Sequence, residues 1–488
     1  MGYKIGIDIG TTSLKAVLFD EELDYVYRIS KSYPTIYPMA GRAEQKPDDI
    51  YQAFEEAVQT IRQQYSDIKI DEIAFSSAMH SIIAVNEKGD PITNCLLWSD
   101  NRAAILIDDF KCEQDWLSYY KKTGTPVHPM SPFAKLLWMK AETNLIEEAY
   151  KFIGIKEYIF WKLTGQYVVD FSIASATGLF NIHELDWDKE ILATTSVRPD
   201  QLSRAVDVTS RFDIKDQVTY DKLNLNQDTQ LVIGASDGCL ANLGTGASEK
   251  GQTTLTIGTS GALRMTVDEP LLDEEGRTFC YYLTQGKWVV GGAVNNGGNV
   301  IQWLDHILFD GEGHLFSQLP EIMQTTIPGS NGLFFFPYLN GERAPFWDGN
   351  MQGSYYGLGI YHQKNDMIRA SIEGVLFNLN QVLHLIEEIA GQTAIVLASG
   401  GFLKSSQWAQ LAADVFGKTL VIPHEAESSC LGAVMLTATS EKKTNHDNHI
   451  YPQIDSAASY RALFDTYEWY SEKLYDLHLV AQKESMLK

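Results

Sequence analysis

A short turn rich in glycine and hydroxyl side chains occurs twice in this sequence, once near the start of each half. The first copy, residues 8–15, reads Asp-Ile-Gly-Thr-Thr-Ser-Leu-Lys, and the second, residues 255–263, reads Leu-Thr-Ile-Gly-Thr-Ser-Gly-Ala-Leu. An apolar run precedes each turn and another follows it, so each copy is predicted to form a β-hairpin. Internal similarity of this kind predicts two related domains.

The tips of these hairpins have the groups that bind phosphate. Backbone N–H groups and threonine hydroxyls in a tight turn form a cradle for phosphate oxygens. Asp8, at the end of the first strand, can hold Mg²⁺ through water, because Mg²⁺ prefers one or two carboxylates together with phosphates. An ordinary hairpin with a polar turn is the alternative. The predicted phosphate contacts are Gly10, Thr11, Thr12, Ser13, Lys15, Gly258 and Thr259.

Composition limits the class of protein. The 488 residues suffice for two large domains, and 44% of them are apolar. The net charge of −24 argues against binding to nucleic acid or to an anionic membrane surface. The five cysteines form no Cys-x-x-Cys pair, which indicates reduced thiols in a cytoplasmic protein. The sequence enters a predicted strand at once and has no apolar run approaching about 18 residues, so neither a signal peptide nor a membrane span is expected.

Two polar clusters follow predicted strands in the first half. Met79 and His80 come after an apolar run at 70–75, and Trp98, Asp100 and Arg102 follow another. Strands interleaved with helices indicate an α/β fold, and such sheets bind ligands just outside their strand ends. Each residue also has an ordinary interpretation: a core histidine, a core aromatic or a surface arginine. Their combination favours a ligand site.

A proline-rich loop at 123–138 is a second candidate for substrate contacts. Three prolines stiffen the loop before a predicted helix, and His128 and Met130 lie within it. These two side chains either face a ligand or pack inside the domain, and the sequence leaves both open.

Asp237 is the candidate catalytic base. It follows the apolar run 231–233 and is bracketed by Gly234 and Gly238, which let a ligand approach the backbone closely. An aspartate there can accept the proton of a substrate hydroxyl during phosphoryl transfer. The alternative is a helix N-cap, since Asp is a preferred capping residue. Because Asp237 follows a predicted strand and comes just before the second turn, the catalytic interpretation is favoured.

The second half adds further nucleotide candidates. Gly298 opens a predicted helix whose N-terminus suits a phosphate. Gly400 and Gly401 form a turn after the apolar run 395–398 that suits an adenine or its ribose, although a plain strand–helix joint is the alternative. The spacing of apolar residues predicts a long amphipathic helix over 365–389.

Together these features resemble the FGGY carbohydrate kinases, a family related to actin and Hsp70. The resemblance covers essentially the whole chain and implies an α/β fold of two ribonuclease-H-like domains around a central nucleotide cleft. It implies a first domain at 1–245 that binds sugar and a second at 246–488 that binds ATP, with the last helix packing back on the first domain. The residues that carry it are 8–15, 98–102, 135–138, 234–238, 257–261, 353–373 and 399–402.

The resemblance also implies roles for individual residues. It makes Asp237 the base, puts Asp8 and Asp237 near Mg²⁺, and adds Asn378 to the adenosine contacts. The implied sugar contacts are Met79, His80, Trp98, Asp100, Arg102, His128 and Met130. Within the family, 76–81, 123–130, 154–158 and 337–345 are most similar to gluconate kinases, which implies phosphorylation of a sugar acid by ATP.

Alternatives to gluconate phosphorylation are a pentulose kinase of the same family and an actin- or Hsp70-like ATPase. A DNA-binding regulator is disfavoured, because the sequence has no basic helix-turn-helix segment. Met79, His80 and Met130 differ from the residues of glycerol-phosphorylating relatives and argue against glycerol. A homodimer is plausible for the family. The Lys-x-x-Trp motif departs from the family pattern at Ala141, where a polar residue is usual.

Overall fold

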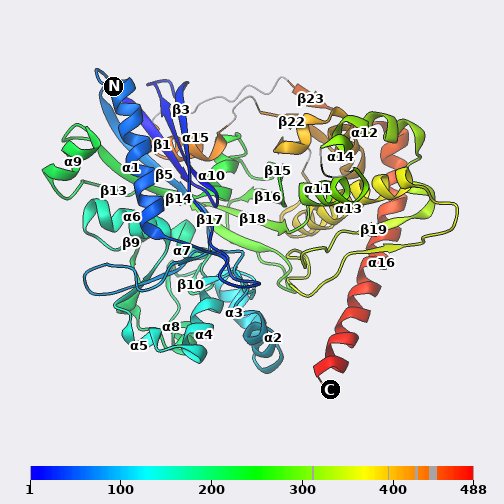
Figure 1. Cartoon of the computed structure of the whole chain (residues 1–488), viewed down its shortest axis with the longest axis horizontal. Coiled ribbons are helices and arrows are strands. Elements are labelled where there is room, and N and C mark those ends of the chain that lie inside the picture. The colour runs from blue at the N-terminus through cyan, green and yellow to red at the C-terminus, as the bar shows by residue number, and fades with distance from the viewer. Residues whose placement is uncertain are drawn as a thin grey trace. The chain divides into compact units, whose positions relative to one another are not determined.

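The protein is described by a computed structural model covering residues 2–309, 311, 313–393, 395–423, 427–438 and 448–486, without the side chains of 483–486. The chain divides into two compact units, which are considered separately (Figure 1). Unit 1 consists of Met1–Ser248, Thr266–Val289 and Glu425–Thr444, and unit 2 of Glu249–Met265, Val290–His424 and Asn445–Lys488.

A six-stranded sheet with the order β13-β14-β5-β1-β2-β3 forms the centre of unit 1. Strands β1 and β2 form the predicted antiparallel hairpin, and β5 runs parallel to both β1 and β14. The strands are β1 (Tyr3–Ile9), β2 (Ser13–Phe19), β3 (Tyr25–Ser32), β5 (Ile70–Ser77), β13 (Arg211–Phe212) and β14 (Gln230–Ser236).

Helices and short strand pairs surround this sheet. The helices of unit 1 are α1 (Pro47–Gln64), α2 (Ala104–Glu113), α3 (Trp116–Thr123), α4 (Pro132–Glu142), α5 (Leu145–Glu148), α6 (Ile155–Thr164), α7 (Phe171–Ser175), α8 (Lys189–Thr195), α9 (Gln217–Leu223), α10 (Asp237–Gly244) and α15 (Ser428–Met435). The shorter strands are β4 (Glu44–Gln45), β6 (Ile83–Val85), β7 (Cys95–Leu96), β8 (Lys151–Ile153), β9 (Val168–Asp170), β10 (Phe180–Asn181), β11 (Asp186–Trp187), β12 (Arg204–Val206) and β17 (Phe279–Thr284).

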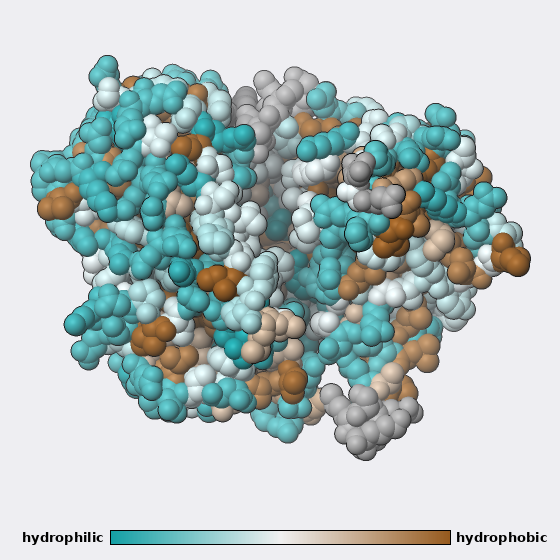
Figure 2. Space-filling model, in the orientation of Figure 1, coloured by the Kyte–Doolittle hydropathy of each residue, from teal (hydrophilic) through white to brown (hydrophobic). Residues whose placement is uncertain are grey.

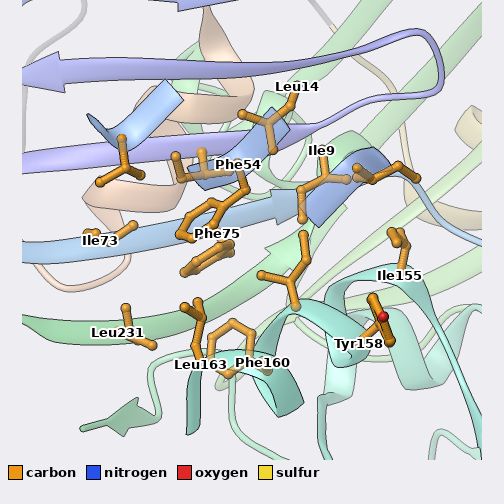
Figure 3. Packing of buried hydrophobic residues seen from close by; sticks show 14 of the residues in the cluster. Ile9, Leu14, Phe54, Ile73, Phe75, Ile155, Tyr158, Phe160, Leu163 and Leu231 are labelled. Atoms are coloured by element: carbon orange, nitrogen blue, oxygen red, sulfur yellow. The ribbon is translucent and has the colours of Figure 1, made fainter. Parts of the chain in front are cut away.

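Aromatic side chains bind the sheet of unit 1 to its helices. Phe75 of β5 lies between Phe54 of α1 and Phe160 of α6, with ring centroids 5.6 and 5.0 Å away (Figure 3). All three rings are fully buried. Burial of an aromatic ring contributes roughly 2–3 kcal/mol, so this stack holds the parallel strands in a fixed position.

Unit 2 contains most of a second sheet, with the order β17-β18-β16-β15-β21-β22-β23. Its other strands are β15 (Thr253–Ile257), β16 (Gly261–Val267), β18 (Lys287–Val294), β21 (Ile395–Ser399), β22 (Thr419–Ile422) and β23 (Asn448–Ile450), with β19 (Phe334–Phe336) and β20 (Ser354–Tyr356) paired apart from it. The helices are α11 (Gly298–Phe309), α12 (His314–Thr325), α13 (Lys364–Ala390), α14 (Ser406–Phe416) and α16 (Ile454–Met486).

The two sheets repeat one topology. In each, a glycine- and hydroxyl-rich turn joins an antiparallel pair, β1–β2 or β15–β16, and the first strand of the pair is parallel to a later strand, β5 or β21. The predicted pair of related hairpins is therefore confirmed. The predicted helix over 365–389 is also confirmed, because α13 spans Lys364–Ala390 and its apolar residues are buried.

The face of the molecule shown in Figure 2 is mostly hydrophilic, with hydrophobic residues in small separate groups. Among the described residues, no helix is long and apolar enough to cross a membrane.

Candidate active site

The parallel strands of unit 1 bring the first candidates to one edge of the sheet. Asp8 of β1 lies level with Ser76 of β5, and Ser236 of β14 lies level with Ser77. Carboxyl ends of parallel strands meet at the same edge, which is where such sheets bind ligands. The sheet register therefore places Asp8 and the residue after Ser236, which is Asp237, at a common edge.

A bulge in β14 shapes the chain just before Asp237. The pairing of β14 with β5 shifts register between Val232 and Ala235. Gly234, inside the bulge, has φ of +67°, and a Cβ added there would lie 1.7 Å from the carbonyl oxygen of Phe75. Only glycine fits this close approach, so the glycine noted in the sequence is required by the strand rather than by a ligand.

Asp8 lies almost buried at the end of β1, with 9% of its surface exposed. The hydroxyl of Ser76 donates to its carboxylate at 2.8 Å. Burial raises the pKa of Asp8, although Ser76 and Lys15 favour the charged form. Lys15 forms an ion pair at 3.0 Å with Glu427, a partner that sequence reasoning did not find because it lies more than 400 positions away.

The first turn and the second polar cluster lie together. The indole N–H of Trp98 donates to the hydroxyl of Thr11 at 3.2 Å, and the side-chain amide of Gln45 donates to the Thr11 carbonyl at 2.5 Å. The hydroxyl of Tyr33 donates to the Gly10 carbonyl. These bonds fix one side of the turn, while Thr12 at its tip is exposed. Gln45 and Tyr33 gave no sequence signal.

Asp100 and Arg102 are paired with each other. The guanidinium of Arg102 contacts both carboxylate oxygens of Asp100, at 2.7 and 2.8 Å, and reaches Glu44 at 2.5 Å. Burial opposes ionisation of Asp100, but Arg102 and the N–H of Ala43 outweigh it and hold its pKa below the ordinary value. The ring of Trp138 lies 4.9 Å from the Arg102 guanidinium. The pair therefore stabilises the wall of the candidate site through internal contacts.

Met79 and His80 lie directly beyond the end of β5. His80 is 9% exposed and has a left-handed backbone, with φ of +68°. Its Nδ1–H donates to the carbonyl of Ala176 at 2.7 Å, which fixes the orientation of the ring. Met79 is half-buried. A non-glycine residue held at positive φ is uncommon and costs roughly 1 kcal/mol or more, which is typical of a binding site.

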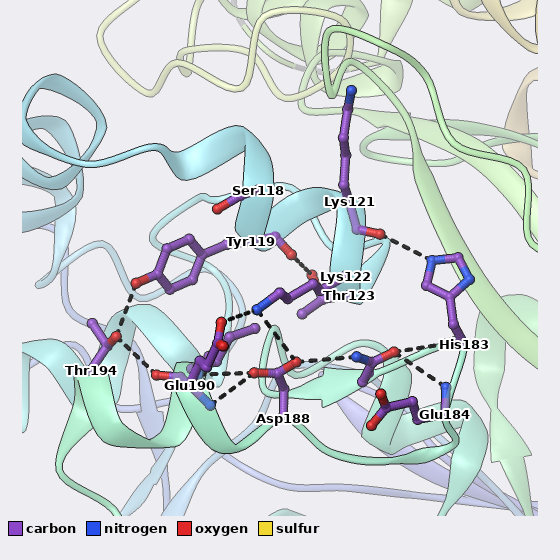
Figure 4. Close-up of polar contacts among 12 residues, drawn as sticks. Ser118, Tyr119, Lys121, Lys122, Thr123, His183, Glu184, Asp188, Glu190 and Thr194 are labelled. Atoms are coloured by element: carbon purple, nitrogen blue, oxygen red, sulfur yellow. Dashed lines mark hydrogen bonds and ion pairs between the residues drawn. The ribbon is translucent and has the colours of Figure 1, made fainter.

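The loop between α3 and α4 is fixed from both ends. At its start, α3 is tied to the 181–194 segment: Tyr119 bonds Thr194 at 2.9 Å, and Lys122 pairs with Glu190 (Figure 4). Further along, the ammonium of Lys135 donates to the carbonyl of Met130 at 2.6 Å.

His128 and Met130, the two candidates in this loop, are buried. The N–H of Met130 donates to Nδ1 of His128 at 3.2 Å. Lys135 is fully buried, and burial lowers its pKa to about 7. The Lys-x-x-Trp motif thus has a structural explanation, because its lysine holds the loop and its tryptophan, Trp138, stacks on Arg102.

Asp237 is the first residue of α10, and Ser236 is the N-cap. The alternative interpretation of Asp237 as the N-cap residue itself is therefore wrong by one position. Its carboxylate accepts from the N–H of Gly238 at 2.7 Å, and the side chain is half-buried. The helix dipole favours a carboxylate in the first turn of a helix.

In unit 2, the second turn lies against the start of α11. The N–H of Gly298 donates to the carbonyl of Gly258 at 2.7 Å, and a Cβ added to Gly298 would lie 2.6 Å from that oxygen. A Cβ added to Gly400, which has φ of +109°, would lie 2.3 Å from the carbonyl oxygen of Ile257. The structure therefore brings together Gly258, Gly298 and Gly400, and leaves Thr259 exposed at the tip.

A buried glutamate supports this second turn. Glu342 is fully buried and accepts from the backbone N–H of Asn295 at 2.5 Å and the side-chain amides of Asn296 at 3.2 Å and Asn378 at 2.9 Å. Burial raises the pKa of Glu342 to about 7. Asn378, expected near adenosine, is fully buried and contacts this glutamate. The only sequence signal for Glu342 was its place in 337–345, one of the segments with the family resemblance.

Asp8 and Asp237 are the candidate ligands for Mg²⁺. Among the residues that the structure describes, no three His, Cys, Asp or Glu side chains lie together as metal ligands. Mg²⁺ bound to a nucleotide takes its other ligands from phosphate and water, so one or two carboxylates are sufficient. Asp8 and Asp237, at one sheet edge, fit that requirement.

The model of the FGGY family of carbohydrate kinases matches the chain in two parts, its N-terminal domain over residues 3–244 and its C-terminal domain over residues 253–441. The chain belongs to the FGGY family. The predicted two-domain sugar-kinase fold is thereby confirmed, and ATP is the expected phosphoryl donor for a kinase of this family.

Among FGGY proteins, several resemble this chain along nearly its whole length. The gluconokinase of Bacillus subtilis (strain 168) is 44% identical over 481 residues, which is 94% of each chain. The crystal structure of gluconate kinase from Lactobacillus acidophilus has a TM-score of 0.92 at 38% identity, covering 97% of this chain and 98% of that one. A ligand-bound xylulose kinase from the same organism has a TM-score of 0.93 at 37% identity, covering 97% and 99%.

Proposed function

We propose that this chain transfers the γ-phosphoryl group of ATP to the terminal hydroxyl of D-gluconate and forms 6-phospho-D-gluconate. The observation that carries the proposal is the 44% identity to a gluconokinase over 94% of both chains. The edge of the unit 1 sheet supports it, because Asp8 lies near the end of β1, and His80 and Asp237 come after β5 and β14 at the same edge. Trp98 reaches this edge through its hydrogen bond to Thr11.

In this proposal Asp237 orients the sugar hydroxyl and accepts its proton as the bond to phosphorus forms. The N-terminus of α10 favours a carboxylate at this position. Mg²⁺, when bound near Asp8 and Asp237, would neutralise charge on the phosphates. Most of the acceleration would come from positioning and electrostatics, as in other phosphoryl transfers.

The turns are proposed to bind the phosphates of ATP. Thr12 and Thr259 are exposed at the tips of the two turns. The carbonyls of Gly10, Thr11 and Gly258 already accept internal hydrogen bonds. The N–H groups of Gly10 and Gly258 also donate within the turns, to the carbonyls of Ser13 and Ser260. The exposed hydroxyl side chains of Thr12 and Thr259 are therefore the proposed phosphate contacts at these tips. The ammonium of Lys15 is partly satisfied by Glu427, so it adds less positive charge than the sequence suggested.

The sugar acid is proposed to bind beside Met79, His80 and Trp98. Arg102 is an unsuitable partner for its carboxylate, because Asp100 and Glu44 neutralise it. His80 is held rigidly by Ala176, and a fixed imidazole discriminates between substrates better than a mobile one. The enzyme is further proposed to be cytoplasmic and homodimeric.

A coupled ADP-release assay tests the proposal. Mg-ATP is supplied with gluconate, xylulose, ribulose, glycerol or no sugar. A gluconate-dependent rate far above the others is expected. A rate with xylulose alone would move the assignment to a pentulose kinase, the second candidate, which the 37% identity to a xylulose kinase favours. A rate independent of sugar would contradict both.

Replacing Asp237 by Asn tests the base. The amide keeps the size of the side chain but cannot accept the proton, so kcat should fall by roughly 10²-fold or more. The Kd for ATP, measured by calorimetry, should change little. Near-normal turnover would contradict the assignment of Asp237.

A further inference from the structure

A short helix of small residues, α7, contacts several parts of the candidate site in unit 1. It runs from Phe171 to Ser175 and is capped by Asp170, whose carboxylate accepts from the N–H of Ile173 at 2.9 Å. Its residues Ser172, Ala174 and Ser175 are fully buried. None of them was assigned a role by sequence reasoning or by the mechanism above.

The N-terminal end of α7 is tied to β14, the strand that ends just before Asp237. The ammonium of Lys156 pairs with Asp170 at 2.6 Å and donates to the carbonyl of Ala235 at 3.0 Å. A second link joins Ser172 to Ser236: the Ser236 N–H donates to the Ser172 hydroxyl at 3.2 Å, and the two hydroxyls lie 3.0 Å apart. The two residues immediately before Asp237 are therefore held by Lys156 of α6, which pairs with the N-cap of α7, and by Ser172 of α7.

The C-terminal end of α7 is tied to the proposed sugar contacts. The carbonyl of Ala176, the next residue, accepts from His80 at 2.7 Å. The carbonyl of Ser175 accepts from the hydroxyl of Thr125 at 2.7 Å, at the start of the loop that carries His128. One helical segment, roughly 8 Å long, thus contacts both the strand before Asp237 and the residues that hold the proposed sugar contacts.

The charged pair at this helix is costly to bury. The side chains of Lys156 and Asp170 are 3% and 0% exposed. Taking two charges out of water is unfavourable unless their geometry is good, and apolar residues of similar size often stabilise a protein as well or better. The pair therefore requires an explanation other than stability, and the bond to Ala235 offers one.

We propose that Lys156 and Asp170 are positioning residues for the catalytic base, which hold the end of β14 against α7 so that Asp237 meets the hydroxyl of a sugar bound beside His80. The inference rests on the proposed role of Asp237. It assigns the pair an effect on the chemical step and little effect on substrate binding.

The test uses a double variant, Lys156→Met/Asp170→Leu, assayed in the full-length protein. Removing both charges avoids an unpaired buried charge, so the variant should fold. The carbonyl of Ala235 loses its lysine donor, so kcat should fall roughly 10- to 100-fold, as a small misplacement of a catalytic group does. The KM values for gluconate and ATP should stay within about threefold of the native ones.

A largely buried pair in unit 2, with side chains 16% and 6% exposed, provides the control. Lys418 pairs with Glu387 at 2.7 Å and donates to the carbonyl of Thr393 at 2.8 Å, the same combination of contacts. Neither residue belongs to the proposed site. Lys418→Met/Glu387→Leu should therefore keep the native kcat. Ser172→Ala removes the link to Ser236, so it should lower kcat several-fold. It should also lower thermal stability, because the buried N–H of Ser236 loses its acceptor.

The outcomes separate this inference from the proposed function. Native kcat in Lys156→Met/Asp170→Leu, with Asp237→Asn inactive, would overturn the inference alone. An equal loss of kcat in the control would also overturn it, because the effect would then belong to any buried pair. Native protein with no sugar-dependent turnover would overturn both proposals. If the native substrate is a pentulose, the same variants are assayed with that sugar.

Discussion

Replacement of Glu342 by Gln should change how the stability of the protein depends on pH. Glu342 is fully buried, and burial raises the pKa of its carboxyl to about 7 from an ordinary value of 4.5. The folded protein therefore binds this proton more tightly than the unfolded chain does. The contribution of Glu342 to stability is greatest below about pH 4.5 and is lost as the pH rises through about 7.

The size of the effect follows from the pKa difference. About 2.5 units at about 1.4 kcal/mol each give about 3.4 kcal/mol in total. Of this, about 2.5 kcal/mol is lost between about pH 5 and about pH 8. Glutamine has the shape of the protonated acid and does not titrate, so Glu342→Gln lacks this loss. The side-chain oxygens of Asn296 and Asn378 have no hydrogen-bond partner in the native protein. They can accept from the amide of the new glutamine if the asparagine side-chain amides rotate by about 180°.

Urea denaturation of native protein and Glu342→Gln at several pH values measures the difference. The free energy of unfolding of the variant, relative to native, should rise by about 2.5 kcal/mol from about pH 5 to about pH 8. Glu321→Gln, at an exposed glutamate of α12, is the control and should show no such trend. A constant difference between Glu342→Gln and native would refute the argument that Glu342 takes up a proton in this range.

Two further predictions concern the two turns and the sugar loop. Gly298→Ala places a methyl group 2.6 Å from the Gly258 carbonyl oxygen, so the turn must move. The KM for ATP should then rise roughly tenfold in steady-state kinetics. Gly349→Ala is the control and should behave as native, because its Cβ meets nothing within 4 Å. An unchanged KM in Gly298→Ala would mean that the turn does not bind phosphate. Lys135→Met leaves the Met130 carbonyl without its donor, which should cost about 1–3 kcal/mol in thermal unfolding and raise the KM for gluconate more than that for ATP. An equal rise in both KM values would contradict a role limited to the sugar loop.

Several residues could be placed from the sequence because their signals are local. The hairpin at 8–15 and its second copy follow from alternating apolar runs around a glycine-hydroxyl turn, and α13 follows from a helical repeat sustained over its length. Asp237 was placed at a strand end because an apolar run and two glycines bracket it. Its position in the helix was missed by one residue, since Ser236 and Asp237 are both good capping residues.

Other residues could not be interpreted because their partners are distant in the chain. Arg102 was a candidate sugar contact, yet Glu44, 58 positions away, neutralises it. Lys15 has its partner in Glu427. Whether a charged side chain is available to a ligand depends on which opposite charge the fold brings beside it, and spacing along the chain does not contain that information.

The sequence by itself determined the α/β class, the two related hairpins, the acid at the strand end and the resemblance to a kinase family. These depend on periodicity and on short motifs, where neighbours in the chain are also neighbours in space. Only the tertiary structure decided the buried supports of the site. The contacts of Lys156 with Asp170 and Ala235, and of Glu342 with Asn296 and Asn378, join segments that the sequence separates by 14 to 79 positions. Burial makes such contacts strong because water no longer competes for their hydrogen bonds, and burial is a property of the folded chain.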